Sequence, residues 1–164
     1  ASVGLGLIVI NIAKQAQDGK KYTEILETIP EIIEKTEIYL AIKDLSYIVK
    51  GGRLPSWVKK IADFCNIKPI LTTKGDGSMG IGGVLRGNKN LAQKLSTFII
   101  KKLDKDKSYS ISIAHSNTLE NGQELLKLIN NNHNNISSIY LMDLGCALGV
   151  HAGPGSLAVA IQPD

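Results

Sequence analysis

The chain has few of the features that mark several common protein classes. Aromatic residues make up only 5% of its 164 residues, so we expect none of the stacking platforms with which proteins bind single-stranded nucleic acid. Its cysteines, Cys65 and Cys146, are too few and too far apart for a disulfide framework, and with three scattered histidines they form no metal-site pattern. No apolar run approaches the roughly 18 to 20 residues of a membrane span. We therefore expect a cytoplasmic protein without nucleic acid, metal or membrane span.

The charge is weakly positive and evenly spread. Nineteen lysines and arginines against fifteen acids leave a formal net charge of +4. The lysines occur in short pairs, such as Lys59-Lys60 and Lys101-Lys102, mixed with acids along expected helix faces. A nucleic-acid-binding domain would gather its cations on one face. The charge therefore indicates an ordinary solvated surface.

Length and hydrophobic content indicate a single domain. With 43% hydrophobic residues, a chain of 164 residues buries enough apolar surface for one stable core. The sequence opens at Ala1, without an initiator methionine, and runs directly into a helical pattern. We expect it to be a segment of a longer protein.

Hydrophobic periodicity predicts a mixture of helices and strands. Gly75-Asp76-Gly77 is typical of a tight hairpin turn, Pro30 is expected to kink or split the second helix, and alternating serines at 108–114 indicate a half-buried strand. These features predict an α/β (α+β-like) fold: one mixed, largely antiparallel sheet of about five strands with helices mainly on one face. The expected helices are 5–16, 23–33, 44–48, 56–65, 90–103 and 118–129, and the expected extended segments are 37–42, 67–73, 79–86, 108–114, 136–141 and 157–161.

Two glycine-containing segments suggest a ligand site. In His151-Ala152-Gly153-Pro154-Gly155, the glycines expose backbone amides and allow close approach, and the histidine can donate a hydrogen bond to an anion. In Gly51-Gly52-Arg53, the arginine offers a planar cation suited to a carboxylate or phosphate. Each segment also has a purely structural interpretation, as a turn between strands and as a helix C-cap respectively.

No set of residues forms a complete catalytic site. The segment Ser2-Val3-Gly4-Leu5-Gly6-Leu7 is rich in glycine but lacks the lysine of a phosphate-binding loop. His115 is a candidate base and Asp143 a candidate partner for His151, yet no serine or cysteine lies in a nucleophile elbow. We therefore expect no catalytic residues and no enzyme.

Taken together, these segments resemble the DegV family, whose bacterial members bind long-chain fatty acids. The matching pieces span nearly the whole chain in the family order, and their combination is more specific than any one of them. They are Ser2-Val3-Gly4-Leu5-Gly6, Asp44-Leu45-Ser46-Tyr47 leading into Gly51-Gly52-Arg53, Ile67-Lys68-Pro69-Ile70-Leu71 with Asp76-Gly77, Arg86 shortly before a helix, and His151-Ala152-Gly153-Pro154-Gly155.

The resemblance implies that residues 1–164 are the C-terminal lipid-binding domain with its connecting N-terminal helices, and that an N-terminal α/β domain is absent. It implies an acyl chain in an apolar tunnel between two domains, whose carboxylate is presented to a separate fatty-acid kinase. The chain would then be a carrier with a long-chain fatty acid as ligand and no cofactor. By position, Arg53, His151, Gly153 and Gly155 would lie near the head group, and Arg86 would face the kinase.

Two alternatives remain open from the residues alone. One is a kinase-like phosphotransferase subunit, which the missing phosphate loop disfavours. The other is a protein-interaction module without a ligand, in which Arg86 and the lysine pairs form a docking face.

Overall fold

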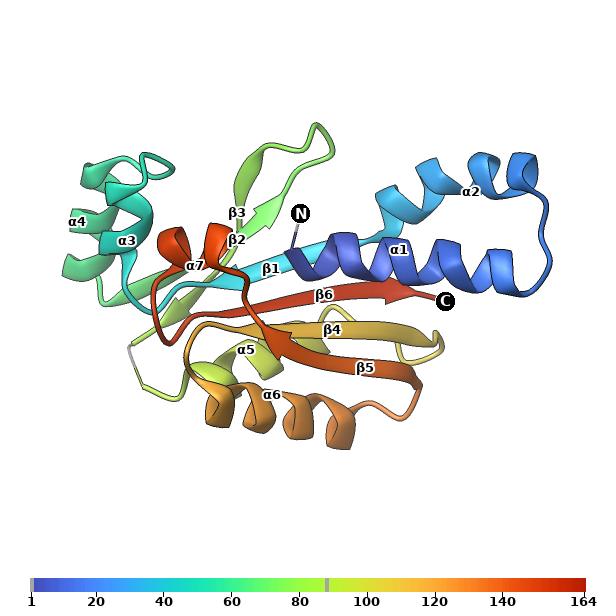
Figure 1. Ribbon diagram of the computed structural model, residues 1–164. Coiled ribbons are helices and arrows are strands. Elements are labelled where there is room, and N and C mark those ends of the chain that lie inside the picture. The colour runs from blue at the N-terminus through green and yellow to red at the C-terminus, as the bar shows by residue number, and fades with distance from the viewer. Residues whose placement is uncertain (1, 88) are drawn as a thin grey trace.

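A six-stranded sheet forms the centre of the molecule. In the computed structural model, which describes residues 2–87 and 89–164, the strands lie in the order β3-β2-β1-β6-β4-β5 (Figure 1). Among these strands only β4 and β5 pair in parallel. The mixed, largely antiparallel sheet is therefore confirmed, with six strands where we expected about five. The strands are β1 (Glu37–Ala41), β2 (Ile67–Thr73), β3 (Met79–Arg86), β4 (Tyr109–His115), β5 (Ile136–Asp143) and β6 (Leu157–Pro163).

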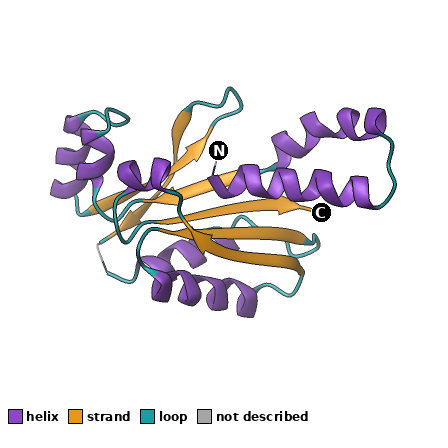
Figure 2. Ribbon diagram, in the orientation of Figure 1, coloured by secondary structure: helices purple, strands orange, loops and turns teal. Residues whose placement is uncertain are grey.

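Seven helices occur in the described residues, and they cover both faces of the sheet (Figure 2). Most lie on one face, as expected, while α5 and α6 cover the other (Figure 1). None of the helices within residues 2–87 and 89–164 has the length and apolar character needed to cross a bilayer. The helices are α1 (Ser2–Gln17), α2 (Tyr22–Lys35), α3 (Leu45–Lys50), α4 (Ser56–Phe64), α5 (Leu91–Ile100), α6 (Leu119–Asn132) and α7 (Cys146–Ala152).

The central strands are buried on both sides. All seven residues of β4 are buried, so the expectation of a half-buried strand was wrong. Ile111 and Ile113 point toward α5 and α6, whereas Ala114 on the opposite face lies beneath α1 together with Ala160. Ser112 shares the parity of Ala114, and its small side chain therefore lies under a helix instead of facing solvent. A strand covered on both faces requires helices on both faces.

Three local features predicted from the sequence can be compared with the structure: a helix cap, a proline within a helix and a hairpin turn. The Asp44 carboxylate accepts a hydrogen bond of 2.8 Å from the Ser46 amide and so caps α3, as expected. Helix α2 runs without interruption from Tyr22 to Lys35 with Pro30 inside it, so the proline does not split the helix. The hairpin between β2 and β3 is also present, and its turn contains Gly77 at φ 81°.

Candidate functional site

Helices α3 and α7 bring together the two glycine-containing segments. Gly51 is the C-cap of α3, and His151 lies in the last turn of α7. A Cβ atom built on Gly51 would lie 2.2 Å from Nδ1 of His151, so the imidazole packs directly against the glycine. No helix was predicted between residues 129 and 157, so α7 was missed. The close contact explains why the α3 C-cap is a residue without a side chain.

The turn after α7 is held by backbone hydrogen bonds. Gly153 has φ 72°, and a Cβ atom there would lie 2.4 Å from Cδ2 of Tyr47, so both its conformation and its contact require glycine. The Gly153 amide donates to the Gly149 carbonyl at 2.8 Å, and the Gly155 amide donates to the Ser116 carbonyl at 2.6 Å. Both amides are therefore occupied within the chain. Their glycines shape the segment that carries His151.

An apolar groove with a volume of 310 Å³ opens beside these helices. Volumes from about 300 Å³ upward are typical of small-ligand sites. Arg53 and His151 both line the groove, and most of the other lining residues are apolar, including Leu40, Ile42 and Leu148. Gly153 and Gly155 are not among the lining residues. The structure thus places two of the four expected head-group residues at the groove itself.

The charge of the groove is one-sided. Arg53 is the one arginine or lysine among the lining residues of this groove, and none of them is an aspartate or glutamate. Nη1 of Arg53 donates to the Gly51 carbonyl at 2.5 Å, and its guanidinium forms no ion pair with the described residues. A guanidinium retains donors for a carboxylate in such a setting. The groove therefore suits a molecule with a long apolar part and an anionic end.

Ser2 is a site residue that the sequence reasoning missed. It lines the groove, and its hydroxyl oxygen is buried without a hydrogen-bond partner among the described residues. An unsatisfied buried hydroxyl costs about 1 to 3 kcal/mol, which a ligand oxygen could recover. The sequence signal was weak, because Ser2 begins a glycine-rich segment without the lysine of a phosphate loop.

Residues 1–164 match the family described as "Uncharacterised protein, DegV family". The chain belongs to the DegV family. A DegV domain-containing protein of Clostridium perfringens is 32% identical over 160 residues, which are 98% of this chain and 56% of that relative. The fatty acid binding DegV family protein of Streptococcus agalactiae has a TM-score of 0.77 at 27% identity, and the match covers 97% of this chain and 56% of that one.

A third similar structure is the Streptococcus pneumoniae Fatty Acid Kinase (Fak) B3 protein, which was solved loaded with linoleic acid. Its TM-score is 0.83 at 20% identity, and the match covers 98% of this DegV chain and 56% of that one. At this identity the likeness shows the fold alone. This DegV family member spans a little more than half the length of the relatives it matches.

Arg86 of this DegV chain lies outside the groove. It is the exposed last residue of β3 and pairs with Ile67 of β2. Met79, at the other end of β3, lines the groove. Arg86 is seven positions after Met79, which is about 23 Å at roughly 3.3 Å per strand residue. Arg86 is thus at a different surface from Arg53 and His151.

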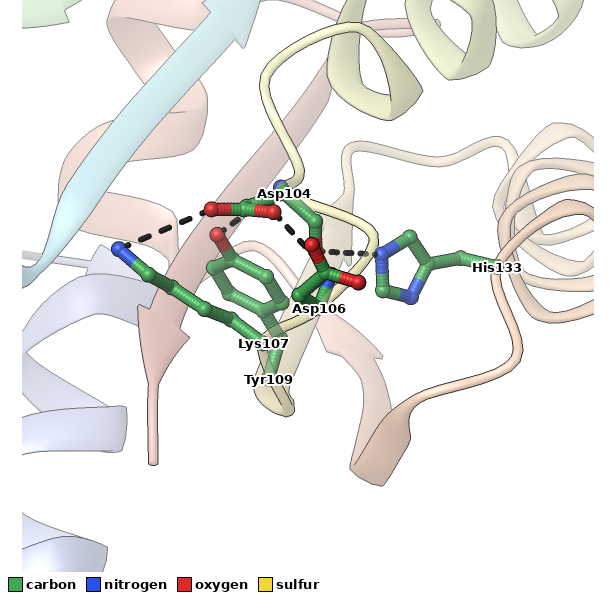
Figure 3. Close-up of polar contacts among 5 residues, drawn as sticks. All are labelled: Asp104, Asp106, Lys107, Tyr109 and His133. Carbon is green, nitrogen blue, oxygen red and sulfur yellow. Dashed lines mark hydrogen bonds and ion pairs between the residues drawn. The ribbon is translucent and has the colours of Figure 1, made fainter.

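The other two histidines, His115 and His133, contact other residues of the chain and do not line the groove. Nδ1 of the buried His115 lies 3.5 Å from the exposed carboxylate of Asp143. Nε2 of His133 lies 3.2 Å from the Asp104 carbonyl, and its ring meets Tyr109 edge-on (Figure 3). His133 therefore joins the end of α6 to the loop before β4. Within the described part of the chain, no three histidine, cysteine or acidic side chains gather as a metal site would require.

Proposed function

We propose that this DegV family member holds a long-chain fatty acid in the groove and acts as a carrier. The observation that carries the proposal is an apolar groove with one unpaired arginine and no acid. Each methylene removed from water contributes about 0.8 kcal/mol, so the acyl chain supplies affinity while the arginine selects the carboxylate. The fatty-acid binding stated for the S. agalactiae relative supports this choice.

The head group is assigned to the polar residues that line the groove. Arg53 and His151 are the donors to the carboxylate, and the buried hydroxyl of Ser2 is a third. Gly153 and Gly155 contribute through the conformation of the segment that holds His151, because their own amides are bonded to carbonyls of the chain.

The chain is proposed to supply one wall of the fatty-acid site. Ser2, Leu5 and Val9 follow the spacing of one helix face on α1, and Leu5 and Val9 are exposed by 52% and 55%. This apolar strip continues from a residue that lines the groove. A segment outside residues 1–164, in the part that the longer relatives have, is proposed to cover it. Residues 1–164 would then be the C-terminal lipid-binding domain.

The carrier is proposed to present the carboxylate to a separate fatty-acid kinase and to have no catalytic activity itself. Arg86 is assigned to the kinase-facing surface, because it is exposed and lies away from the groove. A cytoplasmic location is part of this proposal. It is supported by two exposed free cysteines, Cys65 and Cys146, since thiols stay reduced in that compartment.

Lipid extraction from the full-length protein tests the carrier proposal. We expect mass analysis of protein purified from bacteria to find long-chain fatty acid in near-stoichiometric amount. Leu148→Glu should remove most of it, because Leu148 lines the groove and is only 38% exposed. Val150→Glu is the matched control on the same helix, since Val150 is 65% exposed and does not line the groove. Lipid-free wild-type protein without acyl-chain affinity would refute the proposal.

A second experiment tests the partner surface. Arg86→Ala should leave the lipid content unchanged and lower the formation of acyl phosphate by an added fatty-acid kinase. If acyl phosphate forms equally fast with the wild-type and the variant carrier, the assignment of Arg86 to the kinase-facing surface is contradicted. Nucleotide turnover by the purified carrier alone would favour the phosphotransferase alternative.

A further inference from the structure

A second pocket, polar and small, lies where α5 and α6 begin. Its volume is 100 Å³, and its polar lining residues are Lys43, Lys68, Asn90 and Asn121. It shares no lining residue with the apolar groove. Both helices start on the same side of the molecule beneath the sheet (Figure 1).

Lys68 is the unusual residue of this pocket. The residue is only 8% exposed, its ammonium is not among the fully buried polar atoms, and it forms no hydrogen bond or ion pair with the described residues. On β2 it shares the parity of Ile70 and pairs with Leu85, and both of those side chains belong to the core under α5 and α6. The lysine therefore points to the helix side of the sheet. Lysines are almost never this buried unless they are paired.

The surroundings of Lys68 add positive charge. The α5 N-cap, Asn90, has φ 57° and makes no side-chain cap bond, so the amides of the first turn of this ten-residue helix remain available as donors. Asn121 lies in the first turn of the 14-residue α6, whose N-cap also makes no side-chain cap bond. Both helix starts carry the positive end of a helix dipole.

Lys43 is the second lysine that lines this pocket. The Lys43 side chain crosses Gly155, where a Cβ atom would lie 2.4 Å from Lys43 Cδ. No lining residue of this pocket is acidic. The pKa of Asp44 is lowered mainly by hydrogen bonds from Ser46, and the charge of Lys68 makes a smaller contribution. Two lysines and two helix starts thus converge on a pocket whose lining has no acid, and the neighbouring acids are Asp44 and Glu120, which lies in the first turn of α6.

We propose that this pocket binds a small tetrahedral oxyanion of the phosphate class. A water molecule occupies about 30 Å³ in the liquid, so the pocket has the room of about three waters, which suits one phosphate group. Lys68 and Lys43 supply charge, and the first-turn amides of α5 donate hydrogen bonds to the oxygens. The site is separate from the fatty-acid groove and does not depend on it.

Amide NMR titration of the 164-residue chain with inorganic phosphate tests the site at constant ionic strength, set with chloride. We expect saturable shifts at the amides of Leu91 and Ala92. Lys68→Met should weaken binding about tenfold or more, because it removes a charge-assisted hydrogen bond. Lys127→Met removes the same charge from an exposed position on α6 and should leave binding unchanged.

Two further arms complete the test. Lys43→Met changes an exposed residue, so it keeps the fold and should weaken binding several-fold even if Lys68→Met disturbs folding. Titration with glycerol 3-phosphate distinguishes a phosphate monoester from free phosphate, and binding of either probe that is lost on the lysine substitutions supports the site. Absence of saturable binding of both probes, or equal binding by wild type, Lys68→Met and Lys43→Met, would overturn it.

Discussion

Adding one methyl group at Gly51 tests the contact between α3 and α7. Gly51 has φ −73° and ψ −3°, an ordinary helical conformation, so alanine brings no backbone strain there. Its Cβ atom would lie 2.2 Å from Nδ1 and 3.0 Å from Cε1 of His151, so the imidazole must move. Overpacking of this kind costs about 1 to 3 kcal/mol. For a chain of this size we expect Gly51→Ala to lower Tm by roughly 2 to 12 °C.

A double-mutant cycle isolates the cause of that loss. Unfolding in urea is measured for wild type, Gly51→Ala, His151→Ala and the double variant. Because His151→Ala removes the ring, Gly51→Ala should then cost nearly nothing, and the coupling should equal about 1 to 3 kcal/mol. Gly6→Ala is the control, since no atom lies within 4 Å of its Cβ position and it should stabilise α1 by up to about 1 kcal/mol. If Gly51→Ala costs the same with and without the ring, the proposed contact is refuted.

Three further substitutions test other parts of the structure. Asp44→Ala should cost about 1 kcal/mol by removing the α3 cap. Because hydrogen bonds from Ser46 lower the pKa of Asp44, the stabilisation by its carboxylate is present above about pH 4 and lost below it. If the urea midpoint of the variant depends on acid pH as the wild-type midpoint does, this reasoning is contradicted. The Asn135 amide donates a hydrogen bond to His133 Nδ1, so His133→Ala leaves this amide without its partner and should cost about 1 to 3 kcal/mol in chemical denaturation. An unaltered denaturation midpoint would argue that the contacts of His133 do not stabilise the fold. Pro30→Ala should stabilise the exposed interior of α2 by up to about 3 kcal/mol, and a lowered Tm would show that the proline is favoured there.

The secondary structure was predictable wherever a local signal was strong. The repeating apolar positions of α1 and the glycine turn between β2 and β3 are properties of adjacent residues, so they could be found without the fold. Helix α7 was missed because seven residues give fewer than two full turns of periodicity, and Gly149 lies inside it. The alternating serines of β4 predicted that one side of the strand faces solvent. They are buried because α1, which is distant in sequence, covers that side.

The candidate site was predictable in its residue types and not in its geometry. Arg53 and His151 stood out because a cation and a histidine lie beside glycines. Their meeting depends on α7 packing against α3, which no local pattern encodes. Lys68 drew no attention, because a lysine between apolar strand residues is indistinguishable in sequence from one that faces water. Only the pairing of β2 with β3 shows which side of the sheet it faces.

The position of β6 has a consequence for how this domain folds. Strands β1, β2 and β3 pair with neighbours in sequence order, and β4 pairs with β5, but the two groups are joined only through β6, which lies between β1 and β4. The last strand of the chain thus completes the centre of the sheet. Pairing Glu37 with Ile161 closes a loop of more than a hundred residues, a contact that slows folding through its entropic cost. On the ribosome, the two partial sheets would remain separate, with unpaired edges, until residues 157–163 emerge.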